Sequence, residues 1–290
     1  MEITLLILAA GMGSRYGGLK QLDGLGPNGE TIMDYSVRDA IAAGFNKVVF
    51  VIRRDFADAF QEKVLSRYTD KVRCETVFQD MDAGLSEEHL YLADKREKPW
   101  GTAHAILVAK PVIKGPFAAI NADDYYGADA FLRMAEQLRS DFGLSGAYSM
   151  VGYPLDNTLS DHGSVNRGIC STDEESMLKS IFEGLKIERT SEGLVHHTSG
   201  EKEPLAENPL VSMNFWGFQP DLFDFLVKDF HRFTEETKDD PKSEYFIPFV
   251  VNDMMNREMI RVKVLPTTAR WLGVTYQEDR EKVVSALAEA

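Results

Sequence analysis

The feature that most constrains this sequence is residues 5–22, LLILAAGMGSRYGGLKQL, in which an aliphatic run leads directly into a glycine-rich loop. A continuously apolar run of this kind fits a central strand of a parallel sheet, because both faces of such a strand are covered. Ligands of open α/β sheets bind at the carboxyl ends of the strands. The loop therefore stands where a ligand is expected, and its glycines would let the backbone approach a phosphate closely.

Two well-known glycine-rich loops do not fit this stretch. A P-loop would need a lysine where Leu19 stands, and a dinucleotide-binding fingerprint would need a third glycine where Tyr16 stands. The loop instead carries two cations, Arg15 and Lys20, which are far enough apart to contact different phosphates of one triphosphate. Because the 290-residue chain has a net charge of -14 at pH 7, a site for an anionic ligand must carry its positive charge locally.

The composition narrows the classes of function. The acidic balance argues against a nucleic-acid-binding protein, which would normally present a basic face. No apolar run approaches the length that spans a membrane, and the first residues carry no secretory signal pattern. We therefore expect a cytoplasmic protein that binds neither nucleic acid nor membrane, and the sequence leaves a homo-oligomer open.

Strand patterns alternate with helical patterns through the first half of the chain, which predicts crossover connections and a mostly parallel sheet. The expected strands are Thr4–Ala9, Lys47–Ile52, Val72–Phe78 and Phe117–Ala122. The expected helices are Thr31–Ala43, Asp55–Arg67, Thr102–Val108 and Ala128–Leu138. Residues 80–99 form an insertion for which we expect a lid or a partner surface.

After about residue 144, strand patterns follow one another without long helices between them, which predicts mixed or antiparallel strands added to the same sheet. These strands are Ser145–Tyr153, Ser164–Cys170, Leu178–Phe182, Leu210–Phe218 and Ile260–Pro266, and the helices are Asp221–Arg232, Ser243–Arg257 and a last one from about Gln277. Residues 186–209 are interpreted as a loop or hairpin tip. The sequence thus predicts an α/β fold with a mixed, mostly parallel sheet flanked by helices.

Three further groups of residues stand at predicted strand ends or helix starts. The segment WGTAHA, residues 100–105, places small residues at a helix N-terminus, where amides are available to a ligand. We expect His104 on the helix surface, or behind the residues that contact the ligand, rather than as a catalyst. Gln79 ends the third strand. Asp123 and Asp124 end the fourth strand, and carboxylates suit Mg²⁺, which needs only one or two of them beside phosphate oxygens.

The opening stretch closely resembles the signature of the nucleotidyltransferases that make nucleotide sugars. Their first strand ends in L-A-[AG]-G-x-G-[ST]-R, followed by a lysine a few residues on, and here these positions are residues 8–15 and Lys20. The resemblance implies catalytic roles for Arg15, on the β and γ phosphates of a nucleoside triphosphate, and for Lys20, at its α-phosphate. The implied nucleotide-binding residues are Leu8, Ala10, Gly11, Gly13, Ser14, Gln79, Gly101 and Thr102.

The same resemblance implies a metal site. In the family a strand-terminal aspartate binds Mg²⁺ beside the α-phosphate, and Asp123 matches it, with Asp124 as the alternative. Many members have a second metal ligand near the C-terminus, where this chain departs from the pattern and has Thr275. The second ligand is then Thr275, Asp279 or water, or the metal is held differently. Gln79 matches a glutamine that binds a pyrimidine base, which favours UTP or dTTP.

Weaker matches in the second half imply a site for the sugar phosphate. Gly163, Glu183 at the end of the strand Leu178–Phe182, and Asn214 match its residues. The resemblance covers most of the chain and implies the fold of nucleotide-diphospho-sugar transferases. We therefore expect a single domain over residues 1–290, with a nucleotide-binding half at 1–143 and a sugar-phosphate-binding half with the C-terminal helices at 144–290.

The implied reaction is attack by a sugar 1-phosphate on a nucleoside triphosphate, with release of pyrophosphate and with Mg²⁺ as cofactor. Three alternatives stay open. One is a cytidylyltransferase that acts on phosphocholine or another small phosphate, and another is a glycosyltransferase that uses a finished nucleotide sugar. The third is a regulator that binds a nucleotide or sugar without catalysis, for which the departure at Thr275 is the only support.

Overall fold

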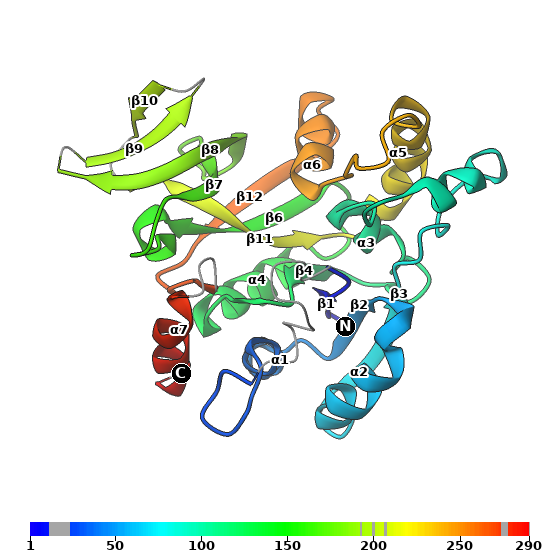
Figure 1. Cartoon of the computed structure of the whole chain (residues 1–290), viewed down its shortest axis with the longest axis horizontal. Coiled ribbons are helices and arrows are strands. Elements are labelled where there is room, and N and C mark those ends of the chain that lie inside the picture. The colour runs from blue at the N-terminus through cyan, green and yellow to red at the C-terminus, as the bar shows by residue number, and fades with distance from the viewer. Residues whose placement is uncertain (12–23, 192, 199–200, 206–207, 274–277, 290) are drawn as a thin grey trace.

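The computed structural model describes residues 1–11, 24–191, 193–198, 201–205, 208–273 and 278–289. Within them an 11-stranded mixed sheet has the order β10-β9-β8-β7-β11-β4-β1-β2-β3, with β6 paired to β11 and β12 paired to β6 (Figure 1). This confirms the predicted α/β fold with a mixed sheet between helices.

The first half of the chain forms the parallel part of this sheet. Its strands are β1 (Thr4–Leu8), β2 (Lys47–Ile52), β3 (Arg73–Phe78) and β4 (Phe117–Asn121), all mutually parallel. Successive residues of β1 are buried on opposite faces, with Leu5 and Ile7 in one hydrophobic core and Leu6 in the other. A strand covered on both faces is apolar at every position, which explains the continuous run in the sequence.

The second half adds strands of both directions. They are β6 (Ala147–Pro154), β7 (Val165–Thr172), β8 (Leu178–Thr190), β9 (Gly193–Thr198), β10 (Glu201–Pro204), β11 (Leu210–Phe218) and β12 (Arg261–Pro266), with the two-residue pair β5 (Asp124–Tyr125) and β13 (Leu272–Gly273). β11 runs antiparallel to β4, β6 and β7, and β12 runs parallel to β6.

Residues 186–209, which the sequence analysis interprets as a loop or hairpin tip, contain more strand than expected. β8 continues to Thr190, and β9 and β10 extend it as an antiparallel ribbon at one end of the sheet (Figure 1). Ile187 of β8 and Leu194 of β9 are buried in a hydrophobic core, but the next buried position of β9 is His196, so the sequence shows no alternating apolar pattern there.

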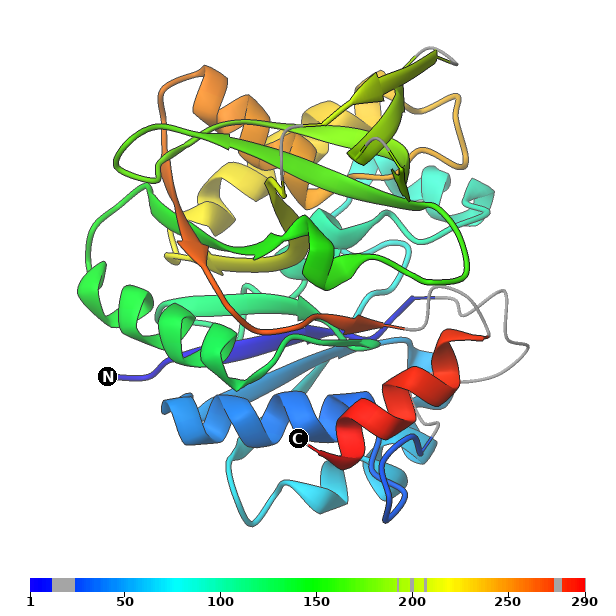
Figure 2. The same ribbon diagram turned by 90° about the vertical axis from the view of Figure 1, so that its left-hand side faces the viewer.

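Helices cover both faces of the sheet (Figures 1 and 2). The helices are α1 (Ile32–Ala43), α2 (Ala57–Lys63), α3 (Thr102–Leu107), α4 (Ala128–Ser140), α5 (Leu222–Glu236), α6 (Ile247–Asn256) and α7 (Asp279–Ala288), with 3₁₀ turns at Arg54–Phe56, Leu65–Arg67, Glu87–Lys95 and Leu155–Thr158. α1, α2 and α4 pack in one core, and α3, α5 and α6 pack in the other. No helix in these described ranges is both long and apolar enough to cross a membrane.

The insertion at residues 80–99 packs against the C-terminal half. The Trp100 indole donates to the carbonyl of Met81 at 2.7 Å, and His89 Nε2 lies 2.8 Å from a carboxylate oxygen of Glu235 in α5. The Arg96 guanidinium donates to Ser243 Oγ at 3.1 Å. None of residues 80–99 lines the large pocket described below; the contacts of His89 and Arg96 tie the segment to the second half of the chain.

Candidate active site

The carboxyl ends of the parallel strands bring three of the predicted motifs to one edge of the sheet. Leu8, the last residue of β1, lies between Val51 of β2 and Asn121 of β4. The amide of Ala122 donates to the Leu8 carbonyl at 3.2 Å, so the glycine-rich loop begins beside the strand-end acids. The Gln79 amide donates to the Ile52 carbonyl at 3.0 Å, which brings the end of β3 to the same edge.

Of the predicted nucleotide-binding residues in the first loop, the structure places Leu8, Ala10 and Gly11. Ala10 is buried. Gly13, Ser14, Arg15 and Lys20 lie outside the described residues, as does Thr275.

Gln79 supports the loop that precedes α3. Its Nε2 donates to the Gly101 carbonyl at 2.9 Å and lies 3.2 Å from His104 Nδ1. His104 Nε2 lies 2.7 Å from the carbonyl of Ala83. Because a carbonyl only accepts, Nε2 carries the proton and Nδ1 accepts from Gln79. The expected surface position of His104 is wrong: the insertion covers it and the side chain is fully buried.

The burial of His104 predicts a loss of stability in acid. Burial, which disfavours the charged form, lowers the pKa of this imidazole to about 4 from an ordinary value of 6.5. Below pH 6.5 His104 binds a proton in the unfolded chain but stays neutral in the folded chain. The free energy of unfolding should therefore fall by about 1.4 kcal/mol per pH unit, roughly 3 kcal/mol in all by pH 4. Urea unfolding of the wild type and of His104→Gln at pH 7, 6, 5 and 4 measures the difference.

The difference in the free energy of unfolding between the wild type and His104→Gln separates the effect of His104 from that of the carboxylates, which also titrate in acid. His162→Gln, which removes an exposed histidine, is the control and should keep the wild-type slope. If His104→Gln kept that slope as well, the neutral buried imidazole would be disproved.

Gly101 has a backbone conformation that the fold requires. Its φ is 106°, and a Cβ at this position would lie 2.6 Å from the carbonyl oxygen of Tyr245. The amide of Ala103 donates to that same carbonyl at 2.9 Å, and Thr102 Oγ1 accepts from the amide of Ile247 at 3.2 Å. The WGTA segment is therefore held against residues 245–247, which begin α6.

Gly101→Ala should destabilise the protein by about 2–4 kcal/mol. About 1–2 kcal/mol comes from the positive φ and the rest from steric overlap with a backbone that cannot move freely. Gly29→Ala is the matched control, because Gly29 has φ 82° but open space around the position of its Cβ. Chemical denaturation should show a clearly smaller loss for Gly29→Ala, and equal losses would contradict the steric contribution.

The acids at the end of β4 differ in their surroundings. Asp124 Oδ2 accepts from Asn121 Nδ2 at 2.9 Å and from the Tyr126 hydroxyl at 3.3 Å. Asp124 also pairs with Gly273 in the β5–β13 ladder, so the C-terminal motif RWLG reaches the end of β4. Asp123 lies half-buried on the turn between β4 and β5. Burial, reinforced by the Asp124 charge, raises the pKa of Tyr126, which stays a hydrogen-bond donor.

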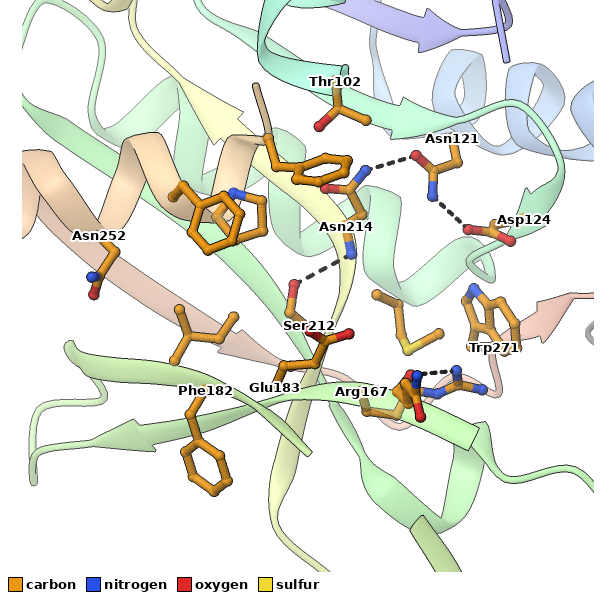
Figure 3. A pocket seen from close by; sticks show the side chains of 17 residues that line it. Thr102, Asn121, Asp124, Arg167, Phe182, Glu183, Ser212, Asn214, Asn252 and Trp271 are labelled. Atoms are coloured by element: carbon orange, nitrogen blue, oxygen red, sulfur yellow. Dashed lines mark hydrogen bonds between the residues drawn. The ribbon is translucent and has the colours of Figure 1, made fainter. Parts of the chain in front are cut away.

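A chain of amides continues from Asp124 into the sheet (Figure 3). Asn121 Oδ1 accepts from Asn214 Nδ2 at 2.6 Å, and Asn214 Oδ1 accepts from the indole of the fully buried Trp216 at 3.0 Å. Asn214 has a φ of 64° where the β6–β11 register shifts. Such a bulge re-aims a side chain out of the regular strand pattern, and here it aligns the Asn214 amide with Asn121.

A pocket of about 600 Å³ opens beside this chain (Figure 3). It brings together four predicted site residues: Thr102, Asp124, Glu183 and Asn214. Glu183 lies within β8 rather than at its end, since this strand runs on to Thr190.

The pocket wall also contains residues that the sequence did not assign. They are Asn121, Asn166, Arg167, Gly168, Ile181, Phe182, Ser212, Met213, Phe246, Pro248, Phe249, Asn252 and Trp271. Arg167 follows the predicted Gly163 by four residues, and Trp271 belongs to a segment considered only for its metal ligand, so both were within reach of sequence analysis.

The other predicted site residues that the structure describes do not line this pocket; they are Leu8, Ala10, Gly11, Gln79, Gly101, Asp123, Gly163 and Asp279. Gly163 lies exposed in the bend before β7. Asp279, the first residue of α7, is buried, accepts from Ser160 Oγ at 2.8 Å and lines a separate small cavity with Gly273. The structure therefore does not bring Asp279 into one pocket with Asp124.

The donor set at the end of β4 fits Mg²⁺. Asp123 and Asp124 offer hard carboxylate oxygens at the strand end, and both charges act on the Tyr126 hydroxyl that they flank. The described part of the chain has no group of three or more acidic, histidine or cysteine side chains poised around a metal. Mg²⁺ is commonly held by one or two carboxylates, with substrate phosphates and water as its other ligands, so this set is sufficient.

Comparisons with known proteins agree with this arrangement. Residues 5–109 match the family described as the MobA-like NTP transferase domain. A search of curated protein sequences finds no significant match.

Among solved structures, three similar proteins share the fold over nearly their whole length. One is described as a glucose-1-phosphate thymidylyltransferase from Bacillus anthracis in complex with a sucrose, with a TM-score of 0.66, 13% identity, and 99% of this chain and 96% of that chain covered. An inositol-1-phosphate CTP transferase from T. maritima has a TM-score of 0.62, 15% identity, and 99% and 96% covered. A UDP-glucose pyrophosphorylase complexed with UDP-glucose has a TM-score of 0.61, 17% identity, and 100% and 99% covered.

Similarity at these identities establishes a common fold, and the family match describes residues 5–109 as an NTP transferase domain. Together they confirm the resemblance that the opening loop suggested. Residues 5–109 therefore match the MobA-like NTP transferase domain, and along its whole length the chain has the fold of solved structures described as sugar-phosphate nucleotidyltransferases.

Proposed function

We propose that this protein transfers a nucleotidyl group from UTP or dTTP to a sugar 1-phosphate and releases pyrophosphate. The observation that carries the proposal is the register of β1 against β4, which pairs Leu8 with Asn121. It sets the start of the glycine-rich loop beside Asp123 and Asp124, at the rim of the 600 Å³ pocket. A triphosphate on the loop and an acceptor in the pocket would therefore meet at the strand-end acids.

The reaction needs positioning and charge neutralisation more than a protein nucleophile. An acceptor phosphate oxygen forms a bond to the α-phosphorus while the bond from that phosphorus to the oxygen that bridges the α and β phosphates breaks, and this oxygen leaves with pyrophosphate. No protein base is required, because the acceptor phosphate is already ionised at neutral pH. We assign Arg15 to the departing β and γ phosphates and Lys20 to the α-phosphate.

Asp123 is proposed to hold Mg²⁺, with Asp124 as the alternative. Asp124 Oδ2 is engaged by Asn121 and Tyr126, which suits a carboxylate that shapes the pocket wall. When bound, Mg²⁺ would neutralise negative charge on the reacting phosphates. For the second ligand Thr275 and Asp279 remain the candidates, and water can also fill such positions.

On the acceptor side, Glu183 is the proposed hydrogen-bond acceptor for sugar hydroxyls, because its carboxylate lines the pocket from β8. Asn214 also lines the pocket, but its Oδ1 and one Nδ2 hydrogen are engaged by Trp216 and Asn121. One amide hydrogen of Asn214 is then left for a ligand.

The names of the similar structures support the class of reaction and leave the substrate pair to experiment. They refer to thymidylyl transfer, to UDP-glucose, and to CTP with inositol 1-phosphate. Because proteins of one fold are named for thymine, uracil and cytosine nucleotides and for sugar and inositol phosphates, we infer that side chains rather than the fold select the substrate. The cytidylyltransferase alternative therefore belongs in the same test.

The test is pyrophosphate release with Mg²⁺, using each of the four NTPs and dTTP against sugar 1-phosphates, inositol 1-phosphate and phosphocholine. We expect turnover with UTP or dTTP and one sugar 1-phosphate, and a loss of about 10²- to 10³-fold in Arg15→Ala. Arg133→Ala, at an exposed arginine of α4, should retain wild-type activity.

Each alternative gives a different result in this assay. Release only with CTP and phosphocholine or inositol 1-phosphate would replace the proposal by the cytidylyltransferase. Nucleotide binding without pyrophosphate release from any pair would favour the regulator. Transfer from a finished nucleotide sugar, with no pyrophosphate formed, would identify a glycosyltransferase.

A further inference from the structure

Arg167 is a buried cation in the wall of the large pocket. It lies on β7, is 9% exposed, and its guanidinium carbon sits 4.9 Å from the centroid of the Trp271 ring (Figure 3). Among the described residues that line the pocket it is the one cation, facing a wall that otherwise carries the carboxylates Asp124 and Glu183.

The hydrogen-bond partners of Arg167 are all neutral. Nε donates to Thr158 Oγ1 at 3.2 Å, Nη2 donates to the Thr158 carbonyl at 2.5 Å, and Nη1 donates to the Asn166 carbonyl at 2.9 Å. A guanidinium has five N–H groups, so one on Nη1 and one on Nη2 remain beyond these bonds. Two N–H groups on adjacent nitrogens suit bidentate binding of an oxyanion.

The positive charge of Arg167 is not balanced by a salt bridge. No carboxylate of the described ranges lies within 4.0 Å of its guanidinium nitrogens. Burial lowers the pKa of Arg167 to about 10, against the opposing charges of Asp124 and Asp279, so the group stays charged at neutral pH. A buried charge without a counter-ion is costly. A neutral side chain could tie β7 to Thr158 without that cost, so the charge itself calls for a partner.

We propose that Arg167 binds the phosphate of the acceptor, and that the pocket selects acceptors by this anion. The proposal rests on the proposed function and deepens it. An acceptor phosphate entering the pocket would otherwise meet only carboxylates and neutral groups. Arg167 supplies the attraction from β7, on the acceptor side, while the cations proposed for the triphosphate belong to the first loop.

Trp271 provides a local signal for this binding. Its indole Nε1 is buried and has no hydrogen-bond partner in the described part of the chain, and its ring contacts the Arg167 guanidinium. The protein has three tryptophans, so the indole N–H resonances form a short, assignable set, and Trp271→Phe identifies the one that belongs to Trp271.

The experiment is an NMR titration of the full chain with inorganic phosphate, followed at the Trp271 indole. We expect phosphate to shift this resonance in the wild type, and Arg167→Met to weaken binding by roughly 10- to 100-fold. Arg261→Met removes an exposed arginine of β12 and should bind phosphate like the wild type. Arg167→Lys keeps the charge but not the fork, so it should lie between the two and serves if the methionine variant fails to fold.

Equal phosphate affinity in Arg167→Met and Arg261→Met would overturn the proposal, and so would a Trp271 resonance that phosphate does not move. Turnover separates this outcome from failure of the proposed function. If a substrate pair is found, Arg167→Met should raise KM for the acceptor by a similar factor and leave KM for the nucleotide nearly unchanged. If no substrate pair turns over but phosphate binding depends on Arg167, the phosphate site is supported and the proposed nucleotidyl transfer is not.

Discussion

Asp123→Asn is expected to lower kcat for pyrophosphate release by about 10²- to 10³-fold, the usual effect of removing one preorganised charge from a site of charge development. Amide oxygen is a weak ligand for Mg²⁺ compared with carboxylate, so the variant should also need more Mg²⁺ for half-maximal rate. A direct binding measurement accompanies the kinetics: the affinity for Mn²⁺, read by EPR in the presence of nucleotide, should fall in parallel.

Asp124→Asn is the matched comparison, because it removes the same charge one residue away. An asparagine there can still accept from Asn121 and Tyr126 through its amide oxygen, so the strand end should keep its shape. We expect a loss of less than about tenfold in kcat and little change in Mn²⁺ affinity, well below the effect expected for Asp123→Asn. The reverse order of the two variants would assign the metal to Asp124.

Asn214→Ala is expected to destabilise the protein by about 2–4 kcal/mol. The change leaves the buried Trp216 indole without an acceptor, which costs about 1–3 kcal/mol, and it puts alanine at a φ of 64°, which costs about 1–2 kcal/mol. Urea unfolding measures the total. The loss should be among the largest for a residue of this size outside the apolar core.

Two further variants separate these causes. Asn214→Gly tolerates the positive φ and should recover about 1 kcal/mol relative to Asn214→Ala. Trp216→Phe removes the indole donor, so a double-mutant cycle with Asn214→Ala should give a coupling of at least about 1 kcal/mol. A coupling near zero would show that the indole bond contributes nothing, and equal stability of the glycine and alanine variants would remove the backbone cost.

The edge of the sheet that carries the candidate active site could be predicted from the sequence. The run at residues 5–8, the acids at 123–124 and the GTA segment each adjoin an element with a strong local pattern, and the structure places all of them where these elements meet. The predicted strands of the first half agree with the observed bounds to within a residue at each end. Local periodicity and the rule that ligands bind at strand carboxyl ends are enough for this.

The predicted helix at Asp55–Arg67 shows the limit of periodicity. Its pattern is continuous, yet the structure divides it into a 3₁₀ turn, the short α2 and a second 3₁₀ turn. His104 shows another limit. The six-residue helix α3 is too short to show a clear polar face in the sequence. His104 is buried because the insertion covers it, with the carbonyl of Ala83 bound to its Nε2.

By itself, then, the sequence determined the α/β class, the parallel half of the sheet and the edge where the loop meets the acids, because those depend on residues close together in the chain. Only the tertiary structure brought together the residues of the proposed acceptor site. In the sequence, Arg167 looks like any arginine of an alternating strand pattern. It becomes a buried cation only because Trp271 and Thr158, more than a hundred residues apart, pack against it. Contacts at such separation depend on how strands and helices pack together, which local residue patterns do not encode.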